Sequence, residues 1–200
     1  HGPASESLHG FTYIREDNPT QARLEEALKA VEGGEAALAF ASGMAAGTAY
    51  LQALPVGAHV IFQDDLYYDF RNVGRDHLPR WGMSASSVDM GDLEAVRAAL
   101  RPETRLVWIE TPSNPLMKVC DIAAIGTLAH AAGARILVDG TFAPPTIQRP
   151  LDLGADAVLH STTKYLGGHS DVQGGGLVFR KRDEMFERTR HNRKVLGGVA

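Results

Sequence analysis

Short apolar segments alternate with helical segments along almost the whole length of this 200-residue chain. Helical spacing and capping residues predict a first helix that begins at Asn18-Pro19-Thr20 and runs to about Val31, and further helices at 43–54, 67–78, 92–100, 122–132 and 183–192. Apolar runs predict strands at 36–40, 59–63, 83–88, 105–110, 135–139, 157–160 and 176–179. This alternation predicts an α/β fold, in which a mostly parallel seven-stranded sheet carries helices on both faces.

The composition excludes several classes of protein. Charged residues make up 22% and hydrophobic residues 44%, which is typical of a globular domain and not of a disordered chain. The net charge of −4 disfavours a nucleic-acid-binding protein. The single cysteine, Cys120, excludes an intramolecular disulfide and indicates a reducing compartment, for which we expect the cytoplasm. No basic-then-apolar leader is visible, so we expect no signal peptide.

The stretch between Glu35 and Asp64 contains no Asp, Glu, Lys or Arg, which invites a transmembrane interpretation. However, this stretch is rich in alanine, contains Ser42-Gly43 and Pro55-Val56-Gly57, and lacks the bulky aliphatic residues of a spanning helix. A buried strand, a tight turn and a helix explain it better, so no membrane contact is expected.

Polar residues follow the predicted strands at their carboxyl ends: Ser42-Gly43, Glu110, Asp139 and Ser161. In open α/β sheets, ligands bind outside this edge of the sheet. We therefore expect these residues to converge on one shared site.

Lys164 lies in the run His160-Ser161-Thr162-Thr163-Lys164-Tyr165, among hydroxyl residues and without a neighbouring carboxylate. An amine for a Schiff base, an acid for the ring nitrogen and donors for a phosphate are what pyridoxal phosphate (PLP) requires. The alternation of Ser161 and Thr163 places two hydroxyl groups on one side, where a phosphate can be met. The alternative is an ordinary surface lysine.

Asp139 ends the apolar run Ile136-Leu137-Val138, so its carboxylate leaves a buried strand. A buried carboxylate is costly unless it is paired with a cation or well hydrogen-bonded. Against the ring nitrogen of PLP it would keep that nitrogen protonated. A capping or turn aspartate is an equally good interpretation of this residue alone.

Three weaker candidates complete the site. Ser42-Gly43-Met44 joins a strand to a helix, where free backbone N–H groups suit a phosphate. An aromatic ring at Tyr67 can stack on a planar cofactor, although one core and one surface tyrosine at 67–68 is the simpler interpretation. Asn114 can hydrogen-bond a phenolate oxygen, or it can serve its own turn.

Other residues indicate no additional site. The eight histidines show no metal-ligand spacing, His169 included, and no metal is expected. Cys120 is interpreted as packed and not reactive. We expect the basic run near the end of the chain to form a solvated or subunit-facing helix; it comprises Arg180, Lys181, Arg182, Arg188, Arg190, Arg193 and Lys194.

Six motifs, in this order, resemble those of the PLP-dependent transsulfuration enzymes of cysteine and methionine metabolism. They are Tyr13-x-Arg15-x-x-Asn18-Pro19-Thr20, Glu32-Gly33-Gly34-Glu35-Ala36, Ser42-Gly43-Met44, Glu110-Thr111-Pro112-Ser113-Asn114-Pro115, Asp139-x-Thr141-Phe142, and the run from His160 to His169. The group includes cystathionine γ-synthases, γ-lyases and β-lyases and methionine γ-lyases. The resemblance implies the large domain of a fold-type I PLP-dependent transferase over 21–200, preceded by an arm at 1–20.

The resemblance also implies roles for individual residues. Lys164 would hold the cofactor and shuttle protons, and Asp139 would pair with the ring nitrogen. Tyr67 would stack on the ring and assist proton transfer, and Asn114 would contact the phenolate oxygen. The phosphate would be held by Gly43, Met44, Ser161 and Thr163, and by Tyr13 and Arg15 of a neighbouring subunit, within a homodimer or homotetramer.

The activity implied is a lyase that eliminates a β- or γ-sulfur substituent from a small sulfur amino acid. The alternatives are a γ-replacement transferase, of the cystathionine γ-synthase or O-acylhomoserine sulfhydrylase type, and a non-catalytic scaffold. The chain departs from the family at Tyr68-Asp69, where glycine usually follows the stacking tyrosine, and at Gly140, where asparagine is common. The chain given also ends before the C-terminal domain that would supply a clamp for the substrate carboxylate.

Overall fold

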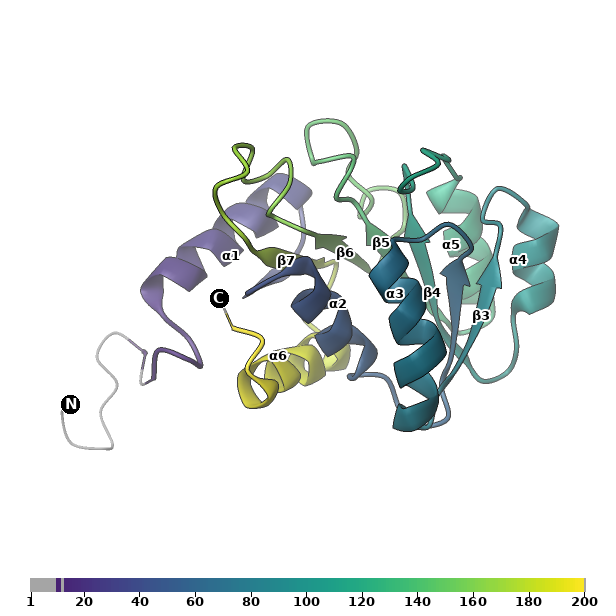
Figure 1. Ribbon diagram of the computed structural model, residues 1–200, viewed down its shortest axis with the longest axis horizontal. Coiled ribbons are helices and arrows are strands. Elements are labelled where there is room, and N and C mark those ends of the chain that lie inside the picture. The colour runs from purple at the N-terminus through teal and green to yellow at the C-terminus, as the bar shows by residue number, and fades with distance from the viewer. Residues whose placement is uncertain (1–9, 12, 200) are drawn as a thin grey trace.

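The computed structural model describes residues 10–11 and 13–199, and its centre is a single seven-stranded sheet (Figure 1). From one edge to the other, the strands are β1 (Ala36–Phe40), β7 (Gly175–Phe179), β6 (Ala157–His160), β5 (Arg135–Asp139), β4 (Thr104–Glu110), β2 (His59–Gln63) and β3 (Ser84–Val88). Strands β3, β2, β4, β5 and β6 pair in parallel, whereas β7 is antiparallel to both of its neighbours. The predicted mostly parallel sheet is confirmed.

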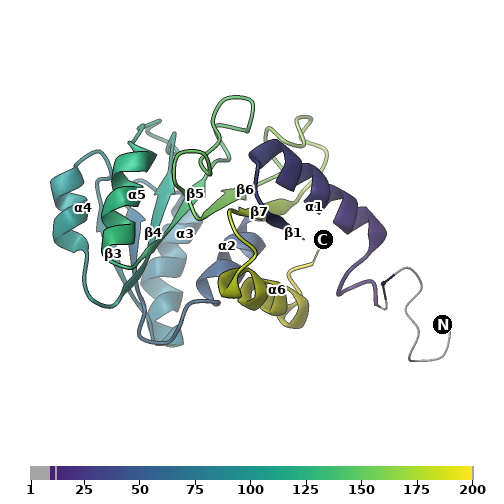
Figure 2. The same cartoon turned by 180° about the vertical axis from the view of Figure 1, so that it is seen from behind.

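Helices cover both faces of the sheet (Figures 1 and 2). One face carries α2 (Gly43–Leu51), α3 (Tyr68–Asn72) and α6 (Glu184–Leu196), and the other carries α1 (Pro19–Glu32), α4 (Leu93–Ala99) and α5 (Ile122–Ala131). Along β4, Leu106 and Trp108 belong to the core beneath the first group, and Val107 and Ile109 to the core beneath the second. This alternation explains why the strand sequences are almost continuously apolar.

Short polar side chains determine where the helices begin. Asn18, Ser42, Asp92, Asp121 and Asp183 each accept a hydrogen bond from a backbone N–H in the first turn of the helix that follows. Such caps satisfy donors that have no partner within the helix. Gly33 and Gly197, both with φ near +75°, end α1 and α6 in the left-handed conformation.

The predicted helix at 67–78 is only partly correct. After five residues, α3 gives way to a π-helical turn, Val73–His77, and a 3₁₀ turn, Leu78–Trp81, which ends at Gly82. Pro79 has no N–H to donate to a preceding carbonyl, so the α-helical ladder cannot continue through it. The predicted helix at 183–192 is in turn too short, because α6 extends to Leu196.

The uncharged stretch forms a strand, a helix and a second strand, as expected: β1, α2 and β2. Across residues 10–11 and 13–199, no helix combines the length and the apolar character needed to cross a membrane. Nor does the described part of the chain bring together three or more His, Cys, Asp or Glu side chains in a way that could hold a metal ion.

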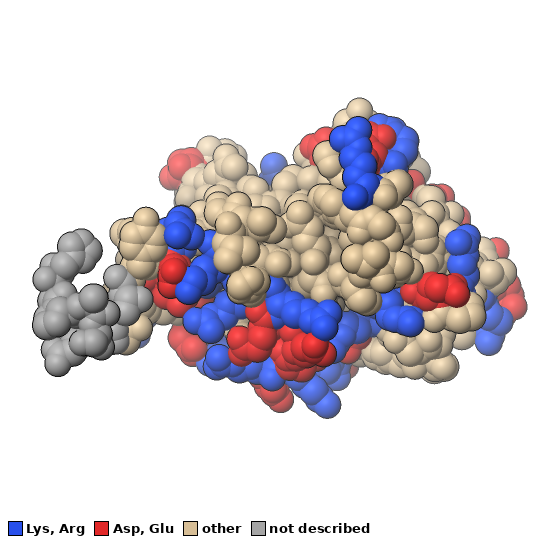
Figure 3. Space-filling model, turned by 90° about the horizontal axis from the view of Figure 1, so that it is seen from below, with Lys and Arg blue, Asp and Glu red and all other residues tan. Residues whose placement is uncertain are grey.

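Four members of the basic run lie on α6, whereas Arg180, Lys181 and Arg182 precede it, and one member on the helix is not solvated. On the face shown in Figure 3, Lys and Arg side chains are mixed with Asp and Glu side chains, and α6 contributes the ion pairs Arg188–Glu184 and Arg190–Glu187. Arg193 is buried, at 1% exposure, which corrects the expectation for this residue.

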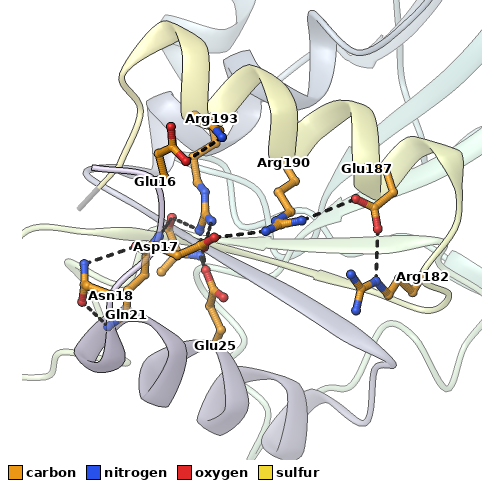
Figure 4. Close-up of polar contacts among 11 residues, drawn as sticks. Glu16, Asp17, Asn18, Gln21, Glu25, Arg182, Glu187, Arg190 and Arg193 are labelled. Atoms are coloured by element: carbon orange, nitrogen blue, oxygen red, sulfur yellow. Dashed lines mark hydrogen bonds and ion pairs between the residues drawn. The ribbon is translucent and has the colours of Figure 1, made fainter. Parts of the chain in front are cut away.

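The guanidinium group of Arg193 contacts the carboxylates of Asp17 and Glu25 and the carbonyl oxygen of Ala39 (Figure 4). Asp17 also pairs with Arg190 at 3.0 Å. Segment 13–18 is therefore tied to α6 and α1 of its own chain.

Candidate functional site

A cavity of about 780 Å³ opens at the edge of the sheet where the parallel strands end. Eight of the ten predicted site residues line it: Gly43, Met44, Tyr67, Asn114, Asp139, Ser161, Thr163 and Lys164. They come from the start of α2, the residue before α3, the end of β5 and the segments that follow β4 and β6. The predicted convergence at the carboxyl ends of the strands is confirmed.

Lys164 lies on the loop after β6, where its backbone N–H donates to the carbonyl of Ser161 at 3.1 Å. Its side chain is exposed and borders the cavity. The same loop is held from two sides. Ser161 N–H donates to the hydroxyl of Thr141 at 2.9 Å, and the Thr163 hydroxyl exchanges hydrogen bonds with the backbone of Gly174 at 3.0 and 3.2 Å. The amine is thus carried on a short, well-anchored turn.

Asp139 ends β5 with a carboxylate that is only 4% exposed. Burial raises the pKa of Asp139, while hydrogen bonding from Thr141 and the nearby His160 oppose the rise. The backbone N–H of Thr141 donates to its Oδ1 at 3.0 Å, and no described side chain forms an ion pair with it. A buried acid with so little compensation favours a cationic partner in the cavity.

Gly140 follows Asp139, and the structure gives a reason for the glycine. A Cβ atom at this position would meet Cε1 of His160 at 2.9 Å and Cγ1 of Val158 at 3.3 Å. The buried imidazole of His160 occupies the space that a side chain would need. Support for Asp139 therefore comes from Thr141 and from this packing.

The start of α2 and the loop after β6 approach each other closely. A Cβ atom at Gly43 would meet the Cβ and Cα atoms of Ser161 at 3.0 and 3.1 Å. The Ser42 hydroxyl accepts from Ala45 N–H at 3.0 Å, and the earlier N–H groups of this nine-residue helix, at Gly43 and Met44, belong to the turn that has no intrahelical acceptors. Backbone donors and the Ser161 hydroxyl thus face the same corner of the cavity, which suits an anion.

Tyr67 immediately precedes α3, and its side chain is 38% exposed at the cavity wall. Its ring meets the ring of Phe70 edge to face, with centroids 6.3 Å apart. Partial burial, followed by the charges of Asp69 and Glu110, raises the pKa of Tyr67. Asp69, one of the departures from the family pattern, therefore acts on this tyrosine.

Glu110 also lines the cavity, as its place at the end of a predicted strand leads us to expect, but the sequence indicates no chemical role for it. It ends β4 opposite Asp139 of β5, and it is 3% exposed. Burial, and then the charge of Asp139, raise the pKa of Glu110 to about 8.

Further lining residues that were not predicted are Phe70, Thr141, Phe142, Leu159, Tyr165, Gly168, Ser170 and Gln173. Of these, Thr141, Phe142 and Tyr165 lie inside the sequence motifs.

Tyr13 and Arg15 are not among the residues that line the cavity. The guanidinium carbon of Arg15 lies 5.0 Å from the ring centroid of Tyr13, and Arg15 Nη1 donates to the carbonyl of Lys194 at 2.7 Å. The tyrosine ring is 51% exposed. Within a single chain, these two residues lie beside α6.

Cys120 is half-buried and packs against the core beneath α4 and α5. Burial raises the pKa of its thiol to about 11. This agrees with a packed, unreactive cysteine.

The sequence model described as "Cys/Met metabolism PLP-dependent enzyme" matches residues 2–200. Among curated proteins, a probable cystathionine gamma-synthase of Herpetosiphon aurantiacus is 47% identical over 190 residues, covering 95% of this chain and 59% of that protein. A cystathionine gamma-lyase of Bacillus subtilis is 45% identical, covering 95% of this chain and 50% of that protein. The chain spans about half the length of the curated relatives it matches.

Solved structures give the same result for the fold. A cystathionine gamma-lyase from Lactobacillus plantarum, complexed with L-serine, superposes with a TM-score of 0.94 at 39% identity, covering 100% of this chain and 51% of that one. The metB protein of Corynebacterium glutamicum gives a TM-score of 0.95 at 40% identity, covering 99% and 51% of the two chains. This chain belongs to the Cys/Met metabolism family of PLP-dependent enzymes.

Proposed function

We propose that this chain is the cofactor-binding part of a PLP-dependent enzyme that eliminates a β- or γ-sulfur substituent from a sulfur amino acid. One observation carries the proposal: a single cavity presents an exposed amine at Lys164, a buried acid at Asp139 and an anion corner at Gly43 and Ser161. These are the groups that PLP requires.

The residues present fit the cofactor. A side chain at Gly43 would crowd Ser161, so the glycine lets backbone donors approach a phosphate there, together with Met44, Ser161 and Thr163. Asp139 would pair with the ring nitrogen, Tyr67 would lie against the ring, and Asn114 would contact the phenolate oxygen. Lys164 would hold the cofactor covalently.

When bound, PLP supplies a ring that takes up the electron pair left on the substrate α-carbon. Once the amine of the substrate has displaced it from the cofactor, Lys164 Nζ would remove the α-proton and, for a γ-substituent, a β-proton as well, while Asp139 would keep the ring nitrogen protonated by opposite charge. Tyr67 assists proton transfer to the leaving sulfur. The sulfur substituent departs as a thiol, and addition of water to the remaining product gives a 2-oxo acid and ammonia.

A second candidate is γ-replacement, in which cysteine or another thiol displaces the substituent of an O-acylated homoserine. It is favoured by the names of similar relatives, since the cystathionine gamma-synthase of Mycobacterium tuberculosis is 53% identical over 170 residues, covering 84% of this chain. Elimination and replacement would use the same residues, so they differ in their substrates: a sulfur amino acid alone, or an O-acylated homoserine together with a thiol.

The proposal also covers the cellular compartment and the oligomeric state of the enzyme. We place it in the cytoplasm, on the support of its single cysteine. Tyr13 and Arg15 support a homodimer or homotetramer with shared sites, because they lie outside the cavity of their own chain. The segment before α1 would then be an intersubunit arm, and 21–200 the PLP-binding large domain.

The decisive experiment is reconstitution of the purified chain with PLP. We expect a visible absorption band, and borohydride reduction should attach the cofactor to Lys164 in a peptide map. Lys164→Ala should abolish attachment, whereas Lys181→Ala, on the exposed surface after β7, should not. Absence of a band in the unaltered chain would favour the non-catalytic scaffold.

Substrate assays then separate the two activities. Release of a 2-oxo acid from L-cystathionine or L-methionine supports elimination. Formation of cystathionine from an O-acylated homoserine and cysteine, without 2-oxo acid, supports replacement.

A further inference from the structure

Glu110 lines the same cavity as Tyr67 and Asn114, the residues proposed to flank the ring. Its Oε2 accepts a hydrogen bond from the backbone N–H of Tyr67 at 2.6 Å. The backbone N–H of Asn114 also acts on this carboxyl group, and together the two donors lower its pKa against the larger effect of burial. One buried side chain thus holds the main chain of the residue proposed to stack on the ring.

A network of buried polar side chains holds Glu110 in turn. Its backbone N–H donates to Gln63 Oε1 at 3.0 Å, and Gln63 Nε2 donates to Asp65 Oδ1 at 2.7 Å. The hydroxyl of Ser113 donates to the other oxygen of Asp65. All four side chains are at most 6% exposed. Such a network favours one arrangement of the loops that carry Asp65 and Ser113, because a shift of either loop leaves a buried polar group unpaired.

We propose that Glu110 is a positioning residue of the cofactor site: its carboxyl oxygen holds the main chain at Tyr67, and its network with Gln63, Asp65 and Ser113 fixes the loop that leads to Asn114. The inference rests on the proposed function for the identity of the ligand. What the position requires is an acceptor oxygen, which a neutral side chain of the same shape can supply.

The test compares Glu110→Gln, which retains an acceptor oxygen, with Glu110→Met, which keeps the length and fills the space without one. The readouts are the visible circular dichroism of bound PLP and its dissociation constant. Loss of a buried acceptor costs about 1–3 kcal/mol, so Glu110→Met should weaken PLP binding about tenfold and reduce the dichroic band. Glu110→Gln should stay within about twofold of the unaltered chain.

Thr104→Val is the matched control. Thr104 lies at the other end of β4, is fully buried, and uses its hydroxyl with His59 Nδ1 and Arg101 N–H. This change should lower the melting temperature and leave the dichroic band unaltered. If Glu110→Met fails to fold, as judged by far-ultraviolet dichroism, Glu110→Ala takes its place in the same measurements.

Two results would overturn the inference. One is a variant without an acceptor that folds and keeps both the band and the affinity. The other is a Glu110→Gln protein that behaves like Glu110→Met, because an acceptor alone would then be insufficient. Failure of the unaltered chain to bind PLP is a different result, since it overturns the proposed function.

Discussion

Glu110 and Asp139 are buried carboxyl groups that end neighbouring parallel strands. Burial raises both pKa values, and the charge of Asp139 adds to the rise of the Glu110 pKa from 4.5 to about 8. Between these two pH values the folded chain holds a proton on Glu110 that the unfolded chain has lost. The free energy of unfolding therefore falls as pH rises through this window, and the penalty is complete only above about pH 8.

Glu110→Gln should remove this penalty. We expect the stability of the variant, relative to the unaltered chain, to increase with pH between 5 and 8 by up to about 1.4 kcal/mol per pH unit. Urea unfolding without PLP at three pH values measures the difference. A stability difference that is constant with pH would contradict the raised pKa.

Sequence reasoning finds Asp139 but not the role of Glu110, although both end apolar strands. The partners of Glu110 come from the loops at 63–67 and 111–114, which only the folded sheet brings together. Arg193 shows the same limit: its helical spacing is visible in the sequence, but its burial depends on Asp17 and Glu25, more than 160 residues away in the chain. Patterns of burial are readable from the sequence, whereas long-range polar partners are not.

Helix α1 is joined to β6 by a buried pair. Glu32, the last residue of the helix, and His160, the last residue of the strand, are at most 1% exposed, and Glu32 Oε1 lies 2.5 Å from His160 Nε2. Their remaining polar atoms, Glu32 Oε2 and His160 Nδ1, have no hydrogen-bond partner among the described residues. Each side chain thus depends on the other.

Glu32→Ala should destabilise the fold by about 3 kcal/mol, because it leaves the imidazole buried and unpaired. Glu26→Ala is the control on the same helix; it breaks only the exposed pair with Lys29 and should cost less than about 1 kcal/mol. Urea unfolding of the unaltered chain and of the two variants measures the loss of unfolding free energy in each. An equal loss of unfolding free energy in the two variants would mean that the buried pair adds no stability.

The elements themselves are largely predictable from the sequence. All seven strands lie where apolar runs predict them, within one or two residues at their ends. The error at 67–78 arises because a hydrogen-bond ladder can change its period without a change in apolar spacing, as happens before Pro79. The antiparallel direction of β7 is a property of topology, which local patterns do not encode.

At the scale of the molecule, the position of Arg15 tests the shared site. If its guanidinium group binds a phosphate in a partner subunit, Arg15→Ala removes a charge-assisted hydrogen bond worth about 2 kcal/mol, and PLP should be retained more than tenfold less tightly. The measurements are PLP content after dialysis and the mass in sedimentation.

Arg97→Ala, on the exposed face of α4, serves as the control and should retain PLP as the unaltered chain does. Unchanged retention by Arg15→Ala in an intact oligomer would count against a shared site. Dissociation of the oligomer by this change would instead assign Arg15 to assembly.

Strand β1 has one neighbour in the sheet, β7, and Ala36 lies opposite Phe179. During synthesis from the N-terminus, β1 therefore emerges long before the strand that will pair with it. Until then it exposes a fully apolar row of five residues and an open edge, which invites pairing with other chains. The interval between the synthesis of β1 and that of β7 is accordingly when the nascent chain is most open to strand pairing with other chains.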